Sequence, residues 1–144
     1  MHYGILNRLR IAACAAAAAL LLATPVSAAV ADFVGVWNDT SHTSQIRSVS
    51  IRQEGDQTIM HVWVGCSSRS HQCDWGEAPM QLFPVVSRPA EAGPTAFLVQ
   101  LDLSSAKVML VGHLNADGFL NLMTFLIQSN SNQTDWWANS TLSR

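Results

Sequence analysis

Short stretches of alternating apolar and polar residues dominate the chain after residue 31. Residues 97–103 are the clearest case, because Phe97, Val99 and Leu101 alternate with residues of mixed polarity. A period of two is typical of a half-buried β-strand, and no stretch after residue 31 shows the period of a helix. The pattern predicts strands over Phe33–Trp37, Gln45–Arg52, Thr58–Val64, Met80–Ser87, Phe97–Leu103, Val108–Leu114, Phe119–Ile127 and Asp135–Leu142.

The links between the predicted strands are mostly short. Glu54-Gly55-Asp56 and Asn115-Ala116-Asp117-Gly118 have the composition of tight turns, and Pro84 indicates an edge or a bulge. Parallel strands need crossovers of a dozen residues or more, so the sheet is predicted to be antiparallel. An eight-stranded up-and-down barrel is the expected fold, with a β-sandwich as the alternative. Such a barrel holds packed side chains or one small ligand.

The first 31 residues differ in kind from the rest. Arg8 and Arg10 precede the apolar run Ile11–Ala23, and small residues follow it. This order predicts a secretory signal peptide, cleaved after Ala28 or Ala31, and a single domain over residues 32–144. A transmembrane anchor is the alternative, but the run is shorter than the roughly 20 residues that a bilayer requires. Cys14 lies inside this run and is expected to leave with the signal.

Charge narrows the choice of partner. Removing residues 1–31 takes away two of the eight Lys and Arg and none of the ten Asp and Glu, so the formal charge becomes 6 − 10 = −4. The remaining basic residues are scattered along the chain. Nucleic acid and anionic membrane surfaces both call for clustered Lys and Arg. We therefore expect neither as a partner, and no membrane span after cleavage.

Two cysteines remain after cleavage, Cys66 and Cys73. An even number in an exported chain predicts a disulfide. The alternative is a metal site made by these cysteines and His71, but zinc cysteines usually lie closer together and a fourth ligand would have to come from elsewhere. We expect a disulfide that fixes the shape of its loop, and no metal or cofactor.

Two patterns resemble known families. Gly35-Val36-Trp37 early in the domain and Arg144 at its end resemble the closure of the calycin superfamily, which includes lipocalins and avidins. That resemblance implies a calycin-like barrel in which the tryptophan packs across one end beneath the basic residue. The longer pattern Gly35-x-Trp37, Ile46-Arg47 and Cys66-x6-Cys73-Asp74-Trp75-Gly76 is similar to a group of small exported bacterial proteins without characterised function. The biotin-site residues of avidins are not recognisable here.

Catalytic motifs are absent from the sequence. There is no G-x-S-x-G, no phosphate-binding glycine loop, no H-E-x-x-H and no C-x-x-C. Most aspartates lie in predicted turns, where Asp is a common turn former. The histidines, among them His42 and His113, are interpreted as solvent-facing or hydrogen-bonded strand residues. We predict no catalytic residues and no enzyme.

Aromatic residues are the better functional signal, and Trp63, Trp75 and His61 are the candidate ligand-binding residues. His61 and Trp63 share one face of a predicted strand. Trp75 lies in Asp74-Trp75-Gly76, which is predicted to turn the chain back, and it serves either as a recognition residue or as a lid over the core. The adjacent Trp136 and Trp137 must point to opposite faces of their strand.

We interpret the chain as a secreted or periplasmic binding protein whose unknown ligand is a small molecule in the barrel mouth or a protein. One alternative is an inhibitor of a hydrolase that uses the Cys66–Cys73 loop. Another is a small barrel enzyme of unknown reaction. Strands Val108–Leu114 and Phe119–Ile127 are apolar on both faces, which predicts a covered outer surface and a homodimer through these two strands.

Overall fold

The computed structural model describes residues 30–41, 44–66, 72–84, 94–130 and 132–144. Most of the predicted signal peptide, together with His42 and His71, lies outside these residues. The fold is all-β with almost no helix. Its eight strands are β1 Gly35–Asn38, β2 Ile46–Glu54, β3 Gln57–Gly65, β4 Gln72–Pro84, β5 Pro94–Asp102, β6 Ala106–Leu114, β7 Leu120–Gln128 and β8 Trp136–Leu142.

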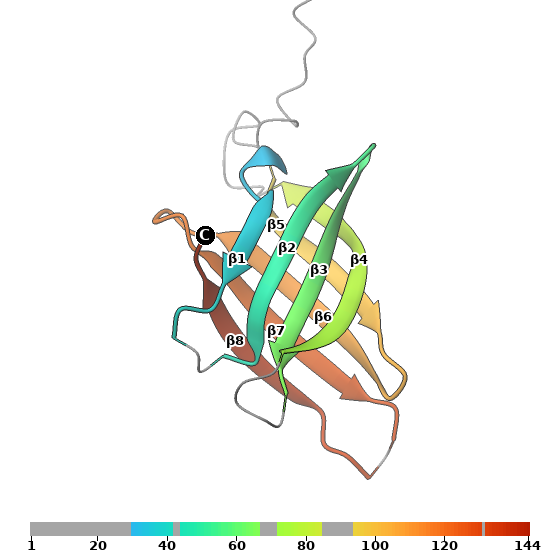
Figure 1. Ribbon diagram of the computed structural model, residues 1–144. Coiled ribbons are helices and arrows are strands. Elements are labelled where there is room, and N and C mark those ends of the chain that lie inside the picture. The colour runs from blue at the N-terminus through green and yellow to red at the C-terminus, as the bar shows by residue number, and fades with distance from the viewer. Residues whose placement is uncertain (1–29, 42–43, 67–71, 85–93, 131) are drawn as a thin grey trace, which may run out of the picture.

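Each strand pairs antiparallel with the next one along the chain, so the sheet order is β1 to β8 in sequence (Figure 1). The sheet curls until its first and last strands meet. Asn38 at the end of β1 forms a bridge with Ser143 just after β8, through two backbone N–H···O bonds of 2.7 and 3.0 Å. The predicted eight-stranded up-and-down barrel is therefore confirmed in preference to a sandwich, as a nearly closed barrel.

Alternation along the strands produces the core. On β3, for example, Met60, Val62 and Val64 are buried inside the barrel, while His61 and Trp63 point away from it. Gly112 on β6 is required by the packing, because a Cβ at this position would lie 2.3 Å from Cζ of Phe97. The buried cluster draws side chains from all eight strands.

One end of the barrel is closed by aromatic residues. Trp37 is buried, and its indole Nε1–H donates to the carbonyl oxygen of Phe33 at 2.8 Å. The Arg144 guanidinium lies 4.5 Å from the centre of the Trp37 ring and donates to the carbonyl of Asp32. The calycin resemblance implies such a contact between an early tryptophan and a late basic residue. Membership of that superfamily stays a prediction.

The prediction that Asp74-Trp75-Gly76 turns the chain back is wrong. These residues lie within β4, which begins at Gln72 and pairs with β3 on both sides of a bulge at Val62/Trp63. Gly76 adopts φ 90°, and its N–H is bonded to the Asp74 carboxylate at 2.6 Å. Asp74 and Gly76 thus form part of a β-bulge, because a bulge, like a turn, can place a glycine at positive φ. A register shift at Phe83/Pro84 matches the bulge that Pro84 predicts.

Candidate binding surfaces

A disulfide joins the end of β3 to the start of β4. The sulfur atoms of Cys66 and Cys73 are 2.02 Å apart, at bonding distance, which agrees with the predicted pairing. Figure 1 shows this end of the β3–β4 pair at the bottom of the barrel, away from the short helical segment that precedes β1 at the top. Within the described residues, no three His, Cys, Asp or Glu side chains are grouped closely enough to hold a metal ion.

His61 and Trp63 lie together on the outer surface of β3. Their rings are stacked, with centres 4.0 Å apart and planes 9° from parallel. The bulge at Trp75 of β4 brings Asp74 beside them, and Nε2 of His61 lies 2.7 Å from Oδ1 of Asp74. The hydrogen bond from His61, together with that from the Gly76 N–H, lowers the pKa of the Asp74 carboxyl. This contact could not be predicted from the sequence, because it depends on the register at the bulge.

The His61–Asp74 pair belongs to a larger group of charged side chains. Nδ1 of His61 faces the Glu77 carboxylate at 3.6 Å, so both ring nitrogens are directed at carboxylates. Arg52 of β2 also binds Glu77, at 2.9 Å. The cluster therefore ties β2, β3 and β4 together on the outer surface.

Trp75 does not join His61 and Trp63. It is half-buried and packs against the core cluster, whereas the other two face outward. The three candidate ligand-binding residues thus form two groups on opposite faces of the sheet. Packing against the core favours the lid interpretation of Trp75.

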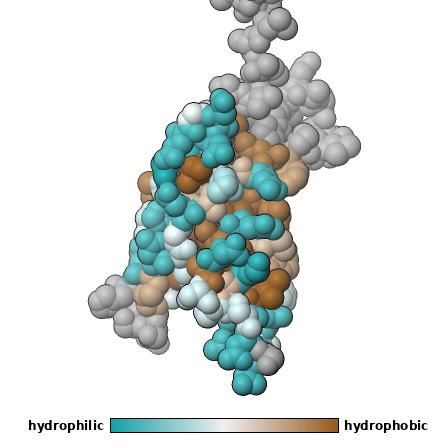
Figure 2. Space-filling view, turned by 90° about the vertical axis from the view of Figure 1, so that its right-hand side faces the viewer, coloured by the Kyte–Doolittle hydropathy of each residue, from teal (hydrophilic) through white to brown (hydrophobic). Residues whose placement is uncertain are grey.

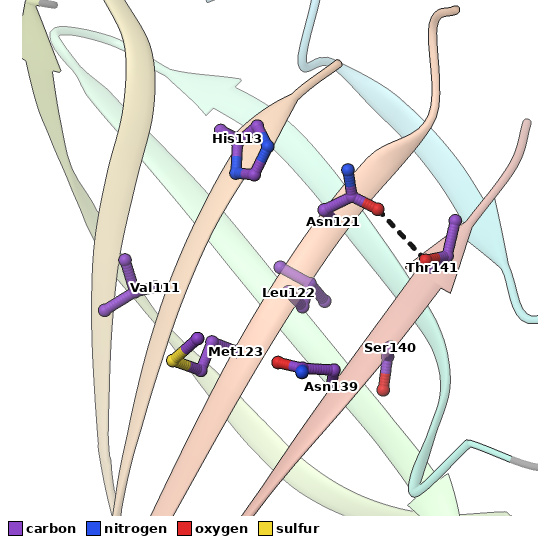
Figure 3. A pocket seen from close by; sticks show the side chains of 8 residues that line it. All are labelled: Val111, His113, Asn121, Leu122, Met123, Asn139, Ser140 and Thr141. Carbon is purple, nitrogen blue, oxygen red and sulfur yellow. Dashed lines mark hydrogen bonds between the residues drawn. The ribbon is translucent and has the colours of Figure 1, made fainter.

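A pocket of about 370 Å³ lies on the outer side of β6, β7 and β8, where the sequence analysis predicted no ligand-binding residue. In Figure 3 the side chains of Val111 and Met123 form its apolar part, and His113 and Asn121 lie toward one end. The Asn121 carboxamide oxygen accepts a hydrogen bond of 3.0 Å from the Thr141 hydroxyl. The complete lining is Val111, His113, Asn121, Leu122, Met123, Asn139, Ser140 and Thr141.

Large apolar side chains surround this pocket. We define the outer apolar face as Met109, Val111, Met123, Phe125, Ile127 and Trp137. Strand register makes it continuous, because Val111 is paired with Met123 and Phe125 is paired with Trp137. Trp137 is 65% exposed and Ile127 is 51% exposed. Figure 2 views the right-hand side of Figure 1 and shows hydrophobic residues at the surface among hydrophilic ones, mainly over the centre and right of that view.

Two polar groups inside the barrel have no hydrogen-bond partner in the described structure. They are the hydroxyls of Thr124 on β7 and Ser140 on β8, both buried. Ser140 is paired with Leu122, two residues from Thr124, so the two hydroxyls lie diagonally across the pair of strands. Buried hydroxyls normally have a partner, often an ordered water.

Comparison with protein families, curated proteins and solved structures gave no match for this chain. In the described part of the chain, no helix has the length and hydrophobicity needed to cross a bilayer. The interpretation of function therefore rests on the surfaces described above.

Proposed function

We propose that this chain is an exported binding protein whose ligand contacts the outer side of β6, β7 and β8. The observation that carries the proposal is the pocket of about 370 Å³ within an exposed apolar face. Pockets that bind small molecules or inserted side chains occupy about 300–1,000 Å³ and combine apolar walls with a few polar groups. Contiguous exposed apolar residues on a soluble domain mark contact sites.

The lining defines the chemistry of the ligand. Val111 and Met123 provide apolar contact, while His113 and Asn139 provide a hydrogen-bond donor and acceptors. No Lys, Arg, Asp or Glu lines the pocket, so the group it accepts is uncharged or weakly polar. A partner protein that inserts an aromatic or aliphatic side chain fits this lining, and so does a small amphipathic molecule. Export is supported by the signal-like sequence and by the cysteine pair at bonding distance.

A fluorescent apolar probe tests the proposal without a known ligand. Titration with N-phenyl-1-naphthylamine, which carries no charge, should give saturable binding near one probe per chain, with energy transfer from Trp137. Met123→Asp should weaken binding about tenfold, which corresponds to about 1.4 kcal/mol, because it puts a charge against the apolar part of the pocket.

Val36→Asp is the matched control. Val36 lies on β1, outside the face, and is 55% exposed, so the same kind of change there should leave the affinity for the probe unaltered. Equal loss in both variants, or no saturable binding by the wild type, would contradict the proposal. A photo-reactive amino acid at position 123 should then cross-link the natural partner after export. The same amino acid at position 36 is the control and should not.

A ligand inside the barrel is a second candidate, because the unpartnered hydroxyls of Thr124 and Ser140 could bind its polar group. Native mass spectrometry of the exported protein should then show a bound small molecule. The joint substitution Thr124→Val and Ser140→Ala should abolish it, since the fold keeps its shape and loses only the two hydroxyls. If the wild type has the mass of the chain alone, the proposal of a ligand inside the barrel is wrong. The proposal of a ligand on the outer side of β6, β7 and β8 is not affected by that result.

A further inference from the structure

Half of the backbone hydrogen-bonding groups of β8 have no partner strand. In an antiparallel strand, the N–H and C=O of one residue point to the same side, and successive residues alternate sides. Ser143 directs both groups at Asn38 of β1. By alternation, Thr141, Asn139 and Trp137 direct theirs to that same side, while Leu142 and Ser140 bond β7.

Nothing in the described structure meets these groups. The bridge between Asn38 and Ser143 provides the backbone hydrogen bonds between β1 and the end of the chain, and the N–H of Asp39 then donates to the carbonyl of Arg47 on β2. Among the described residues, no backbone or side-chain hydrogen bond reaches the backbone of Trp137, Asn139 or Thr141 on the β1 side. The barrel is therefore open along most of β8.

This edge also lacks the usual protection. Natural proteins guard exposed edges with Lys, Pro, bulges or very short strands. The β8 sequence WWANSTL has no charge and no proline, and its pairing with β7 is regular over all seven residues. An unguarded regular edge is a template for another strand.

We propose that β8 pairs with β8 of a second copy of this chain, antiparallel about a two-fold axis at Asn139. In this register, Asn139 lies opposite Asn139 of the partner subunit, and Trp137 lies opposite Thr141 of the partner subunit. Each of these pairs exchanges two N–H···O bonds, so every unpartnered N–H and C=O at positions 137, 139 and 141 is satisfied in both copies. The pairing differs from a dimer through β6 and β7, because it covers part of Trp137 and leaves the residues of the outer apolar face on β6 and β7 open.

The side chains on this edge suit a second copy. Trp137, Asn139 and Thr141 all point outward on the same face and carry no charge, so the two-fold axis brings no like charges together. The exposed Trp137 ring lies across from a threonine of the partner subunit, which covers part of its apolar surface. The pairing does not depend on the function proposed above, since it requires two copies of this chain and no bound ligand.

Cysteine cross-linking tests the register. Residues opposite each other in a hydrogen-bonded antiparallel pair have Cα atoms about 5.5 Å apart. Asn139→Cys should therefore cross-link to a dimer with a short thiol reagent such as dibromobimane. Thr141→Cys is the matched control, because the two copies of that position would lie roughly 13 Å apart along the strands. Thr141→Cys mixed with Trp137→Cys should cross-link again.

Charge substitutions at the two-fold axis provide the second test. In light scattering, the wild type should have the mass of two chains. Asn139→Lys or Asn139→Asp alone should give the mass of one chain, because like charges then face each other. A mixture of the two should recover the dimer. Circular dichroism checks that each variant folds. A monomeric wild type, a dimer that Asn139→Lys leaves intact, or equal cross-linking at positions 139 and 141 would overturn the proposal.

Discussion

Trp75 and Trp137 are tryptophans of one barrel with opposite surroundings. Trp75 packs against the buried cluster from β4, whereas Trp137 projects from β8 and is 65% exposed. We expect Trp75→Ala to lower the free energy of unfolding by about 3 kcal/mol, as for a large side chain removed from packed surroundings. Trp137→Ala should change it by less than about 0.5 kcal/mol in the monomer. Denaturant melts at low protein concentration measure both.

Equal melting midpoints for Trp75→Ala and the wild type would contradict the lid interpretation and support a role for Trp75 in ligand recognition. In that case its loss should weaken binding of a ligand without affecting stability. Trp137→Ala serves as the control for removing an indole of the same size from the surface.

Asp39 carries a buried carboxylate just after β1. It accepts hydrogen bonds from Ser41 Oγ at 2.6 Å and from the N–H groups of Ser41 and Ser44, and Arg47 lies 3.5 Å away. Burial raises its pKa, but the bonds from Ser41 and Ser44 outweigh burial, so the pKa is lowered below the ordinary 3.8. A lowered folded-state pKa gives stability that is present above the unfolded-state pKa and is lost as pH falls through the folded-state value.

Asp39→Asn should therefore be less stable than the wild type near pH 7, and the difference should shrink as the pH falls below about 4. Denaturant melts across this range give the comparison. A difference between Asp39→Asn and the wild type that stays constant with pH would show that the carboxylate charge adds nothing.

The β3–β4 hairpin is held by the disulfide as well as by its ladder. The joint substitution Cys66→Ser and Cys73→Ser releases a loop with a sequence separation of 7. The chain-entropy relation for such a short loop gives a loss of about 2.5 kcal/mol. We expect a folded barrel with a lower denaturant midpoint, and the wild type under reducing conditions should match the variant. A midpoint unchanged in both would show that the bond does not constrain the unfolded chain.

Strands with period-two alternation could be predicted from the sequence, and their bounds hold to within a few residues at β2, β3, β6 and β7. The Asn115 turn is also as predicted, with Gly118 at φ 82° and Asn115 Oδ1 accepting two backbone N–H groups. The first half of β4 was not predicted. Asp74 and Gly76 have the same preferences in a bulge as in a turn, and only the pairing with β3 distinguishes the two.

The outer surfaces show a similar limit. The apolar residues on both faces of β6 and β7 predicted an outer surface that is covered in a homodimer. In the single chain Val111, Met123 and Ile127 are exposed, and the homodimer stays a prediction. The pocket itself could not be predicted, because His113, Asn121 and Asn139 meet only through the register of three strands. The candidate ligand-binding residues are likewise separated in the fold, since His61 and Trp63 lie on the outer surface and Trp75 packs against the core.

At the scale of the whole molecule, the barrel closes through a single bridge, and the exchange of amide hydrogens should report this directly. In dilute solution, the N–H groups of Ala138, Ser140 and Leu142 bond β7 and should exchange slowly. Those of Trp137, Asn139 and Thr141 face the open edge and should exchange fast. Protection along β8 should therefore alternate from one residue to the next, which a frayed or uniformly flexible strand does not produce.

Protein concentration then separates an open edge from a paired one. As the concentration rises and β8 pairs with a second copy, Trp137, Asn139 and Thr141 should become protected together, while the amides that bond β7 change little. Asn139→Lys should keep the alternating pattern at every concentration, since it prevents the pairing and leaves the β7 ladder intact. Uniform protection of β8 in dilute solution would mean that another part of the same chain covers its edge. That result would contradict the proposal that the edge of β8 is open.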